Sequence, residues 1–294
     1  MTSLFQTSIQ KDPRLSGVLI ALLGAFLMSL DPIFIRFSGV SGFDTAFLFG
    51  LFTTISMPLF IQWIDPRGLI GALRASGWPM ILSGLLMLGS ATSLVFSIKL
   101  TTVANTFLIL SIIPAMTAFF CWIFLGEVTK RSTLIAISFA MLGVAIVAWG
   151  SLGSVHIVGD ALALSAVIFV SLNQTLVRKF PDMSRMASVG MGGFFLAVTM
   201  AFLATPSGYS VNTWVIMGIM GLFTAPFGRV LPRVAIRYIT APEVGMILMI
   251  EAALAPLLAF AFFAEIPALA SFVGGGVILA TILVYARATA RDGQ

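Results

Sequence analysis

Ten long apolar runs separated by short polar connections restrict what this sequence can fold into. A helix needs about 20 apolar residues to cross the hydrocarbon core of a bilayer. Only 9% of the 294 residues are charged, against about 25% in soluble domains. We therefore predict an all-α membrane protein with ten transmembrane helices and no inserted soluble domain. The expected spans are residues 15–37, 43–63, 78–98, 102–125, 132–150, 159–177, 186–205, 213–236, 240–264 and 267–286.

The distribution of Lys and Arg predicts the orientation, because cytoplasmic loops of membrane proteins carry an excess of both. With a cytoplasmic N-terminus, two basic residues, Arg36 and Lys99, fall at outer ends and twelve fall at inner ends. Both termini are therefore expected in the cytoplasm. The twelve are Lys11, Arg14, Arg67, Arg74, Lys130, Arg131, Arg178, Lys179, Arg185, Arg237, Arg287 and Arg291.

Composition and motifs argue against several classes of function. The net charge of +5 comes from short loops without a basic stripe, so no nucleic-acid partner is expected. One cysteine, Cys121, and one histidine, His156, leave no Cys/His cluster, and we expect neither a metal site nor a cofactor. The sequence contains no G-x-x-x-x-G-K-[ST] or H-E-x-x-H motif and no plausible Ser-His-Asp group, so we expect neither ATP-driven transport nor an enzyme.

The second half of the sequence repeats the first, with an offset of 142 between the first and sixth runs and 138 between the fourth and ninth. Each half holds five runs, an odd number, so the second half enters the membrane from the opposite side. Residues 1–150 and 151–294 are thus expected to form two inverted five-helix repeats, with a site between them near the midplane. Chance similarity is the alternative, but the matches include polar residues, which apolar helices rarely carry. The offset of 142 matches Gly17, Ala21, Ser29, Leu30, Asp31 and Arg36 with Gly159, Ala163, Ser171, Leu172, Asn173 and Arg178. The offset of 138 matches Thr102, Ile109, Leu110, Ile112, Ala115 and Glu127 with Thr240, Ile247, Leu248, Ile250, Ala253 and Glu265.

Glu251 lies near the middle of the ninth run. A carboxylate at that depth costs about 2.5–3.5 kcal/mol on insertion scales and marks a candidate functional site. Pro256 follows within the same run and frees the carbonyl of Ala252, because proline has no N–H. We expect Glu251 to line the central cavity, where it either pairs with Arg229 or carries a proton.

Two further charged residues lie at membrane depth. Asp31 precedes Pro32 in the outer half of the first run. It could bind a substrate amine or a proton, or pair with Arg36 or Lys99. Arg229 lies in the eighth run, where Pro226 makes a continuous α-helix improbable; it could pair with Glu251 or bind a substrate carboxylate, which suits its planar fork.

The remaining candidates are uncharged or lie nearer the interface. Ser90, Ser93, Asn105, Ser111 and Asn173 are expected at the cavity, although hydroxyls also bond back to their own helix. Arg233, near the inner interface, is expected to extend its head toward water, and Glu127 is expected to pair with Lys130 and Arg131. Helix kinks are expected at Pro32, Pro114, Pro226 and Pro256.

Several segments resemble the drug/metabolite transporter superfamily, in its ten-helix EamA-type branch. They run from Thr102 through Pro114 to Glu127, over Leu142-Gly143-Val144, and from Thr240 through Ile250-Glu251 to Glu265. The family pattern has proline after the second-half glutamate, whereas Ala252 stands there in this chain. Within the superfamily the chain is most similar to aromatic amino acid exporters. The resemblance implies a bacterial inner-membrane permease whose first, third, fourth, sixth, eighth and ninth helices surround a central cavity.

We therefore expect a monomeric secondary transporter in the lipid bilayer that exports small molecules, aromatic and other apolar amino acids, by alternating access. The 26 Phe and 15 Met residues suit varied apolar compounds equally, since Met-rich surfaces repack, so a multidrug or general metabolite exporter is the alternative. A membrane-embedded enzyme or a lipid scramblase is the alternative from another class, and it predicts no saturable solute flux.

Overall fold

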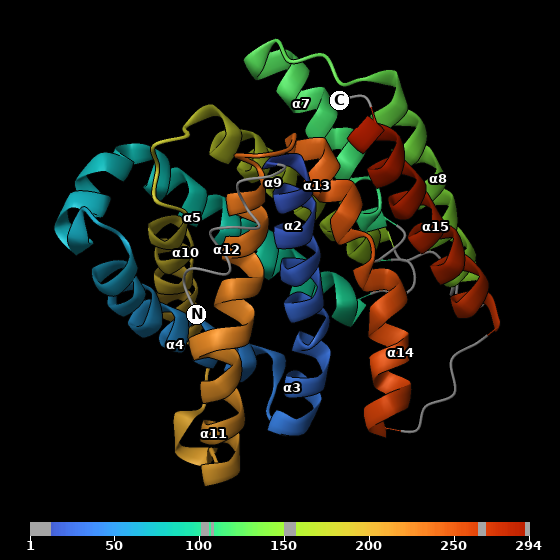
Figure 1. Cartoon of the computed structure of the whole chain (residues 1–294). Helices are drawn as coiled ribbons and strands as arrows, with labels where there is room; N and C mark the ends of the chain where they lie inside the picture. Colours follow the sequence, from blue (N-terminus) through green and yellow to red (C-terminus); the bar gives the residue numbers. More distant parts are fainter. Residues whose placement is uncertain (1–12, 101–105, 107–108, 150–156, 264–268, 292–294) are drawn as a thin grey trace.

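The computed structural model describes residues 13–100, 106, 109–149, 157–263 and 269–291, and within them the secondary structure is helical without strands (Figure 1). This confirms the predicted all-α class. The helices are α2 (Pro13–Ser29), α3 (Asp31–Ser38), α4 (Gly42–Ile64), α5 (Gly68–Leu100), α7 (Ile113–Leu125), α8 (Arg131–Trp149), α9 (Ile157–Lys179), α10 (Arg185–Met200), η1 (Pro206–Gly208), α11 (Val211–Ile219), the π-helix η2 (Met220–Thr224), α12 (Ala225–Ala235), α13 (Ala241–Leu248), α14 (Glu251–Phe263) and α15 (Leu269–Arg291).

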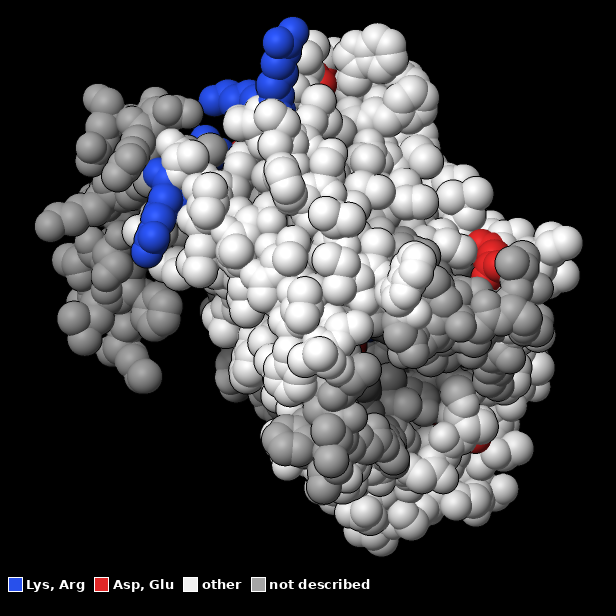
Figure 2. All heavy atoms as spheres, turned by 90° about the vertical axis from the view of Figure 1, so that its right-hand side faces the viewer, with Lys and Arg blue, Asp and Glu red and all other residues white. Residues whose placement is uncertain are grey.

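The helices have the length and the exposed apolar surface of a multi-pass membrane protein. Among the described residues, five helical stretches are long and apolar enough to cross a bilayer, namely Pro13–Ile35, Gly42–Ile64, Gly68–Leu94, Ile157–Lys179 and Val211–Ala235. Shorter apolar helices cover Ile113–Leu125, Arg131–Ile146, Arg185–Met200 and Phe272–Tyr285. Figure 2 shows the face on the side of α8 and α15 as largely uncharged, with Lys and Arg toward its upper end and small areas of Asp and Glu near its top and right edge.

Three helical columns at the centre are interrupted near mid-height. Figure 1 shows α2 above α3, α12 above α11, and α13 above α14. Leu30 separates α2 from α3, directly before Asp31 and Pro32. Because Pro32 has no N–H, an unbroken helix would leave the carbonyl of Met28 without its partner. In the second column the π-helix η2 widens the turn before α12, where Pro226 occupies the first turn. The expectation that this run is not a continuous α-helix is confirmed.

The third interruption differs from the prediction. The turn lies at Met249 and Ile250, directly before Glu251, and α14 continues as an α-helix past Pro256. The kink expected at Pro256 is thus found on the N-terminal side of Glu251. A similar turn at Ser111 and Ile112 precedes α7, with Pro114 in the first helical turn.

The helices pack in pairs that join the two halves of the chain. Helix α2 packs against α12, α5 against α9, α4 against α10, and α8 against α15. Glycine permits the closest of these approaches: a Cβ atom on Gly24 of α2 would lie 2.6 Å from the Pro232 Cδ of α12, and one on Gly50 of α4 would lie 2.6 Å from the Ala197 nitrogen of α10. Because α2 and α12 lie so close together, residues near their ends can meet in the interior.

Candidate functional site

An ion pair joins α3 to α12 at the centre of the bundle. Arg229 Nη1 lies 3.1 Å from Asp31 Oδ2, and the side chains are 27% and 13% exposed. The same nitrogen donates to the Ala225 carbonyl at 3.0 Å, and the guanidinium carbon lies 4.5 Å from the centre of the Phe49 ring. The structure thus pairs Arg229 with Asp31, whereas the sequence suggested Glu251 for Arg229 and Arg36 or Lys99 for Asp31. Glu251 is therefore not the residue that forms the ion pair with Arg229.

Both carboxylates stand at the start of a helix. Asp31 is the first residue of α3, directly after the turn at Leu30, and Glu251 is the first residue of α14, directly after the turn at Met249 and Ile250. The N–H groups of a first helical turn have no intrahelical acceptors, and the helix dipole favours negative charge there. The dipoles of α3 and α14 therefore favour the two carboxylates, whereas the N–H groups of Ile33 and Ala253 already donate to the carbonyls of Leu30 and Ile250.

Glu251 is half-buried and interacts electrostatically with Asp31 and Arg229. Among the residues that the structure describes, no side chain or backbone group hydrogen-bonds to it or forms an ion pair with it. The cluster of Asp31, Arg229 and Glu251 therefore contains two acids and one base. With both acids ionised its net charge is −1, so it has room for one proton or one bound cation.

Arg233 lies one helical turn after Arg229 on α12 and is half-buried. Its Nη1 is buried without a hydrogen-bond partner in the described part of the chain, and its Nη2 lies 3.9 Å from the Sδ of Met87 on α5. The buried Nη1 departs from the expectation that the whole head of Arg233 extends toward water. The interior therefore holds a second arginine that no described carboxylate neutralises.

Asn173 belongs to a separate polar contact between helices. Its Oδ1 accepts from the Ser83 hydroxyl at 2.7 Å, and Ser83 lies 2.9 Å from the Ser188 hydroxyl, so the contact joins α9, α5 and α10. All three side chains are buried. Asn173 thus binds neighbouring helices and is not brought together with Asp31. No sequence signal distinguished Ser83 or Ser188 from other serines in apolar runs.

The other predicted hydroxyl ligands are scattered around the core. Ser90 donates to the Met87 carbonyl of its own helix at 2.9 Å, which is the alternative considered from the sequence. Ser93 and Ser111 are buried, and Ser111 lies in the turn before α7. Thr92 has a buried hydroxyl without a partner among the described residues. Asn105 lies outside the described residues.

Residues 15–149 match the EamA-like transporter family. The first half of the chain is an EamA-like domain. A solved crystal structure superimposes with a TM-score of 0.80 at 18% identity, over 95% of this chain and 99% of the other, and it is one of 29 matching chains. At that identity the likeness shows the fold alone. No curated protein matches the sequence.

The EamA-like domain supplies only part of the central cluster. Asp31 and Phe49 come from it, whereas Arg229, Arg233 and Glu251 belong to the second half. Groups of His, Cys, Asp and Glu that could hold a metal ion were not found among the described residues. The cluster is therefore built from both halves of the chain.

Two networks that the sequence did not predict tie helix ends together away from the central cluster. Near one end, Glu243 is buried and accepts from Arg14 and from Tyr285, whose hydroxyl lies 2.7 Å from that of Thr133. Glu243 also forms a capping box with Thr240 at the start of α13. This T-x-x-E spacing before an apolar run was the available signal.

At the other end, Asp44 of α4 accepts from Tyr209 Oη at 2.7 Å and from the Thr205 amide at 2.7 Å. Burial and this hydrogen bond to a carboxylate raise the pKa of Tyr209, which lies between α10 and α11.

Glu127 pairs with Arg178 at 3.1 Å, whereas Lys130 and Arg131 were the expected partners. These contacts hold loops to the bundle and leave the central cluster to other roles.

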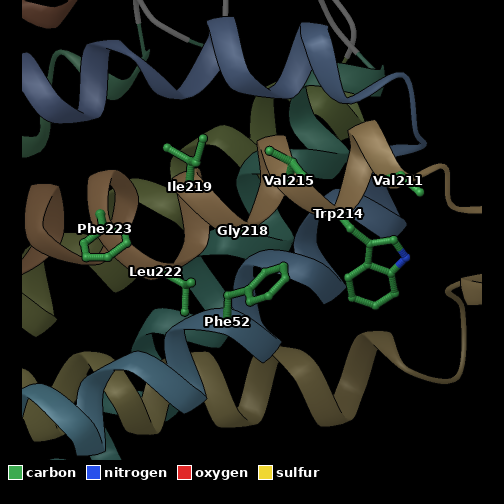
Figure 3. A pocket seen from close by; sticks show the side chains of 8 residues that line it. All are labelled: Phe52, Val211, Trp214, Val215, Gly218, Ile219, Leu222 and Phe223. Carbon is green, nitrogen blue, oxygen red and sulfur yellow. The ribbon is translucent and has the colours of Figure 1, made fainter.

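An apolar groove lies on the outside of the bundle, apart from the charged cluster. Figure 3 shows it between Phe52 of α4 and the residues of α11 and η2. Its lining is almost wholly apolar, and Trp214, Val215 and Phe223 are exposed. Such a surface suits contact with lipid chains, so we do not assign it to a polar substrate.

Proposed function

We propose that this protein is a secondary transporter that exports small molecules, aromatic and other apolar amino acids among them, across the bacterial inner membrane by alternating access. The observation that carries the proposal is the cluster of Asp31, Arg229 and Glu251 at the interruptions of three central helices. Irregular backbone and ionisable groups at membrane depth are tolerated where they line a cavity or are buried in protein, and they mark transport pathways.

The proposal includes ten spans, cytoplasmic termini and two inverted repeats, residues 1–150 and 151–294. In the repeat, α9 is the counterpart of α2, and α5 is the counterpart of α12. Packing supports the repeats, because α2 contacts α12 and α9 contacts α5. Asp31 and Asn173, which match each other in the repeat, also contact counterpart helices: Asp31 binds Arg229 of α12, and Asn173 binds Ser83 of α5. An inverted pair of halves around a midplane site can rock between two openings.

Glu251 is the residue that we assign to energy coupling. It is a half-buried acid beside an ion pair that already satisfies Arg229. Taking up a proton would remove the excess negative charge of the cluster, and losing it would restore that charge. A proton gradient can therefore favour one conformation over the other, which is what coupled export requires.

The proposal is tested by reconstituting the protein in liposomes and measuring the flux of phenylalanine, tryptophan and threonine with and without a pH gradient. Saturable flux of the aromatic pair that responds to the gradient supports it. Glu251→Gln should abolish the response to the gradient while leaving exchange of phenylalanine at equal pH. Absence of flux for all amino acids would reject this substrate assignment.

A general metabolite or multidrug exporter is the second candidate, because the apolar side chains around the cluster could fit varied compounds. In the same liposomes, inhibition of phenylalanine flux by unrelated apolar cations at similar concentrations would favour it. A scramblase or a membrane-embedded enzyme predicts lipid movement or turnover without saturable solute flux. A monomer is the assembly that we propose.

A further inference from the structure

We propose that Arg233 is the anion-binding residue of the central site, so that the transported substrate carries a carboxylate. This inference rests on the transport function proposed above and narrows its substrate class. It assigns the substrate contact to Arg233 and leaves Arg229 as the fixed partner of Asp31.

The first argument is the missing partner of Arg233. Its Nη1 is buried, and neither a carbonyl nor a carboxylate in the described part of the chain accepts from it. The sulfur of Met87, at 3.9 Å from Nη2, is a weak acceptor. Removing one partner from a buried charge pair is strongly destabilising, because the remaining charge is uncompensated. An arginine held in this state is ready to bind an anion that arrives from outside the chain.

The charges around Arg233 reinforce this argument. Within the described part of the chain, the charged groups that act on Arg233 are Arg229 and Arg185, which both carry the same sign as Arg233. Asp31 is already bound to Arg229, and Glu251 interacts with Asp31 and Arg229. A substrate carboxylate would supply the acceptor that Arg233 Nη1 lacks in the described part of the chain, and the planar guanidinium can bind it through two parallel hydrogen bonds.

Arg185 is an arginine of the same chain whose contacts are structural, and it differs from Arg233 in its hydrogen bonds. Arg185 is buried, and although its Nε has no partner in the described part of the chain, its Nη1 donates to the carbonyls of Phe180, Pro181 and Met183, and its Nη2 to that of Val177. Those bonds close the end of α9 and require no ligand. Arg233 has no such set of carbonyls, so a role in fixing helix ends does not account for its burial.

The test compares three ligands that differ in their charged groups. Phenylalanine has a carboxylate and an amine, phenylalaninamide lacks the carboxylate, and phenylpropionate lacks the amine. Each competes for exchange of labelled phenylalanine in liposomes, and each is tested for thermal stabilisation of the purified protein. Wild-type protein should prefer phenylalanine over its amide by about 10- to 100-fold, the range expected for a charge-assisted contact. Arg233→Met should remove this preference and leave the affinity for the amide unchanged.

The matched control is Arg237→Met, the same change one turn further along on an exposed residue, which should keep the wild-type preference. If Arg233→Met does not purify as a monodisperse protein, Arg233→Lys decides, because it keeps the charge and loses the two-pronged contact. It should lower the affinity for phenylalanine by about 3- to 10-fold without changing that for the amide. Equal effects on both ligands would overturn the inference.

The outcomes also separate this inference from the transport function. Absence of amino acid flux, together with stabilisation by phenylpropionate that Arg233→Met abolishes, would reject the amino acid exporter and keep the anion site. Flux of phenylalanine with the wild-type preference in Arg233→Met would keep the exporter and reject the anion site. Failure of every carboxylate to stabilise or compete in the wild-type protein would reject the anion site.

Discussion

The two partners of the central ion pair should not be equally costly to remove. After Asp31→Asn, Arg229 keeps the Ala225 carbonyl and the Phe49 ring and still has Glu251 nearby. After Arg229→Met, two carboxylates, Asp31 and Glu251, remain in the interior without their cation. Arg229→Met should therefore be the more destabilising change, although proton uptake by one of the acids limits its cost.

The magnitude follows from the exposure of the two side chains. Breaking a fully buried pair costs about 3–5 kcal/mol. Because Arg229 is 27% exposed and Asp31 13% exposed, we expect about 2–3 kcal/mol for Arg229→Met and about 1 kcal/mol for Asp31→Asn, once solvent screening is allowed for. The double variant should be less destabilised than Arg229→Met, because one of the two uncompensated acids has been removed.

These differences can be measured by thermal unfolding of the purified proteins in detergent, followed by intrinsic fluorescence at one fixed scan rate. At about 2–4 °C per kcal/mol for a chain somewhat smaller than this one, Arg229→Met should lower the midpoint by roughly 4–10 °C. The exposed Arg237→Met serves as control and should shift it by less than about 2 °C. Additive effects in the double variant, or a greater loss for Asp31→Asn than for Arg229→Met, would refute the reasoning.

Three further predictions concern backbone, packing and pH. Ala252→Pro, in the first turn of α14, should change the free energy of unfolding by less than about 1 kcal/mol, since proline is accepted there. Leu254→Pro removes the 2.9 Å hydrogen bond from the Leu254 amide to the Ile250 carbonyl and should cost about 3 kcal/mol or more. Both variants are measured by thermal unfolding. Gly24→Val should cost about 1–3 kcal/mol or more because its Cβ would meet Pro232 at 2.6 Å; a midpoint equal to wild type contradicts the packing. Tyr209→Phe should be less stable than wild type at neutral pH. Because the pKa of Tyr209 is raised in the folded state, the extra stability of the wild type should be lost as the pH rises above about 10. A stability difference between the two proteins that is unchanged up to about pH 11 would contradict this prediction.

The sequence predicted those features that depend on local composition. Apolar length places helices in each expected run as far as the structure describes them, because a membrane helix needs little more than about 20 apolar residues. Proline has a fixed local effect, so the interruption before Pro32 and the irregular turn before Pro226 were predictable. Depth along a run could also be estimated, which singled out Asp31, Arg229 and Glu251.

Pairing between helices could not be obtained in the same way. Asp31 and Glu251 both lie at depths that Arg229 can reach, so depth alone does not choose between them. The choice is made by the packing of α2 on α12, where Gly24 and Gly228 let the backbones approach. The same limit applies to Asn173, whose partner Ser83 is supplied by the contact between α9 and α5. Each of these partners depends on rotation of one helix against another, which a single sequence does not encode locally.

The turn before Glu251 shows how far a proline pattern can be trusted. With the offset of 138, the turn at Ser111 and Ile112 corresponds to that at Met249 and Ile250. Proline follows the first turn, at Pro114, but alanine stands at the equivalent position after the second. Because the helix is interrupted at both places, the second turn is held by the surrounding packing, in which α13 contacts α7 and α2. Proline therefore favours such a turn without being required for it, and the start of α14 at Glu251 depends on how the two halves of the chain fit together.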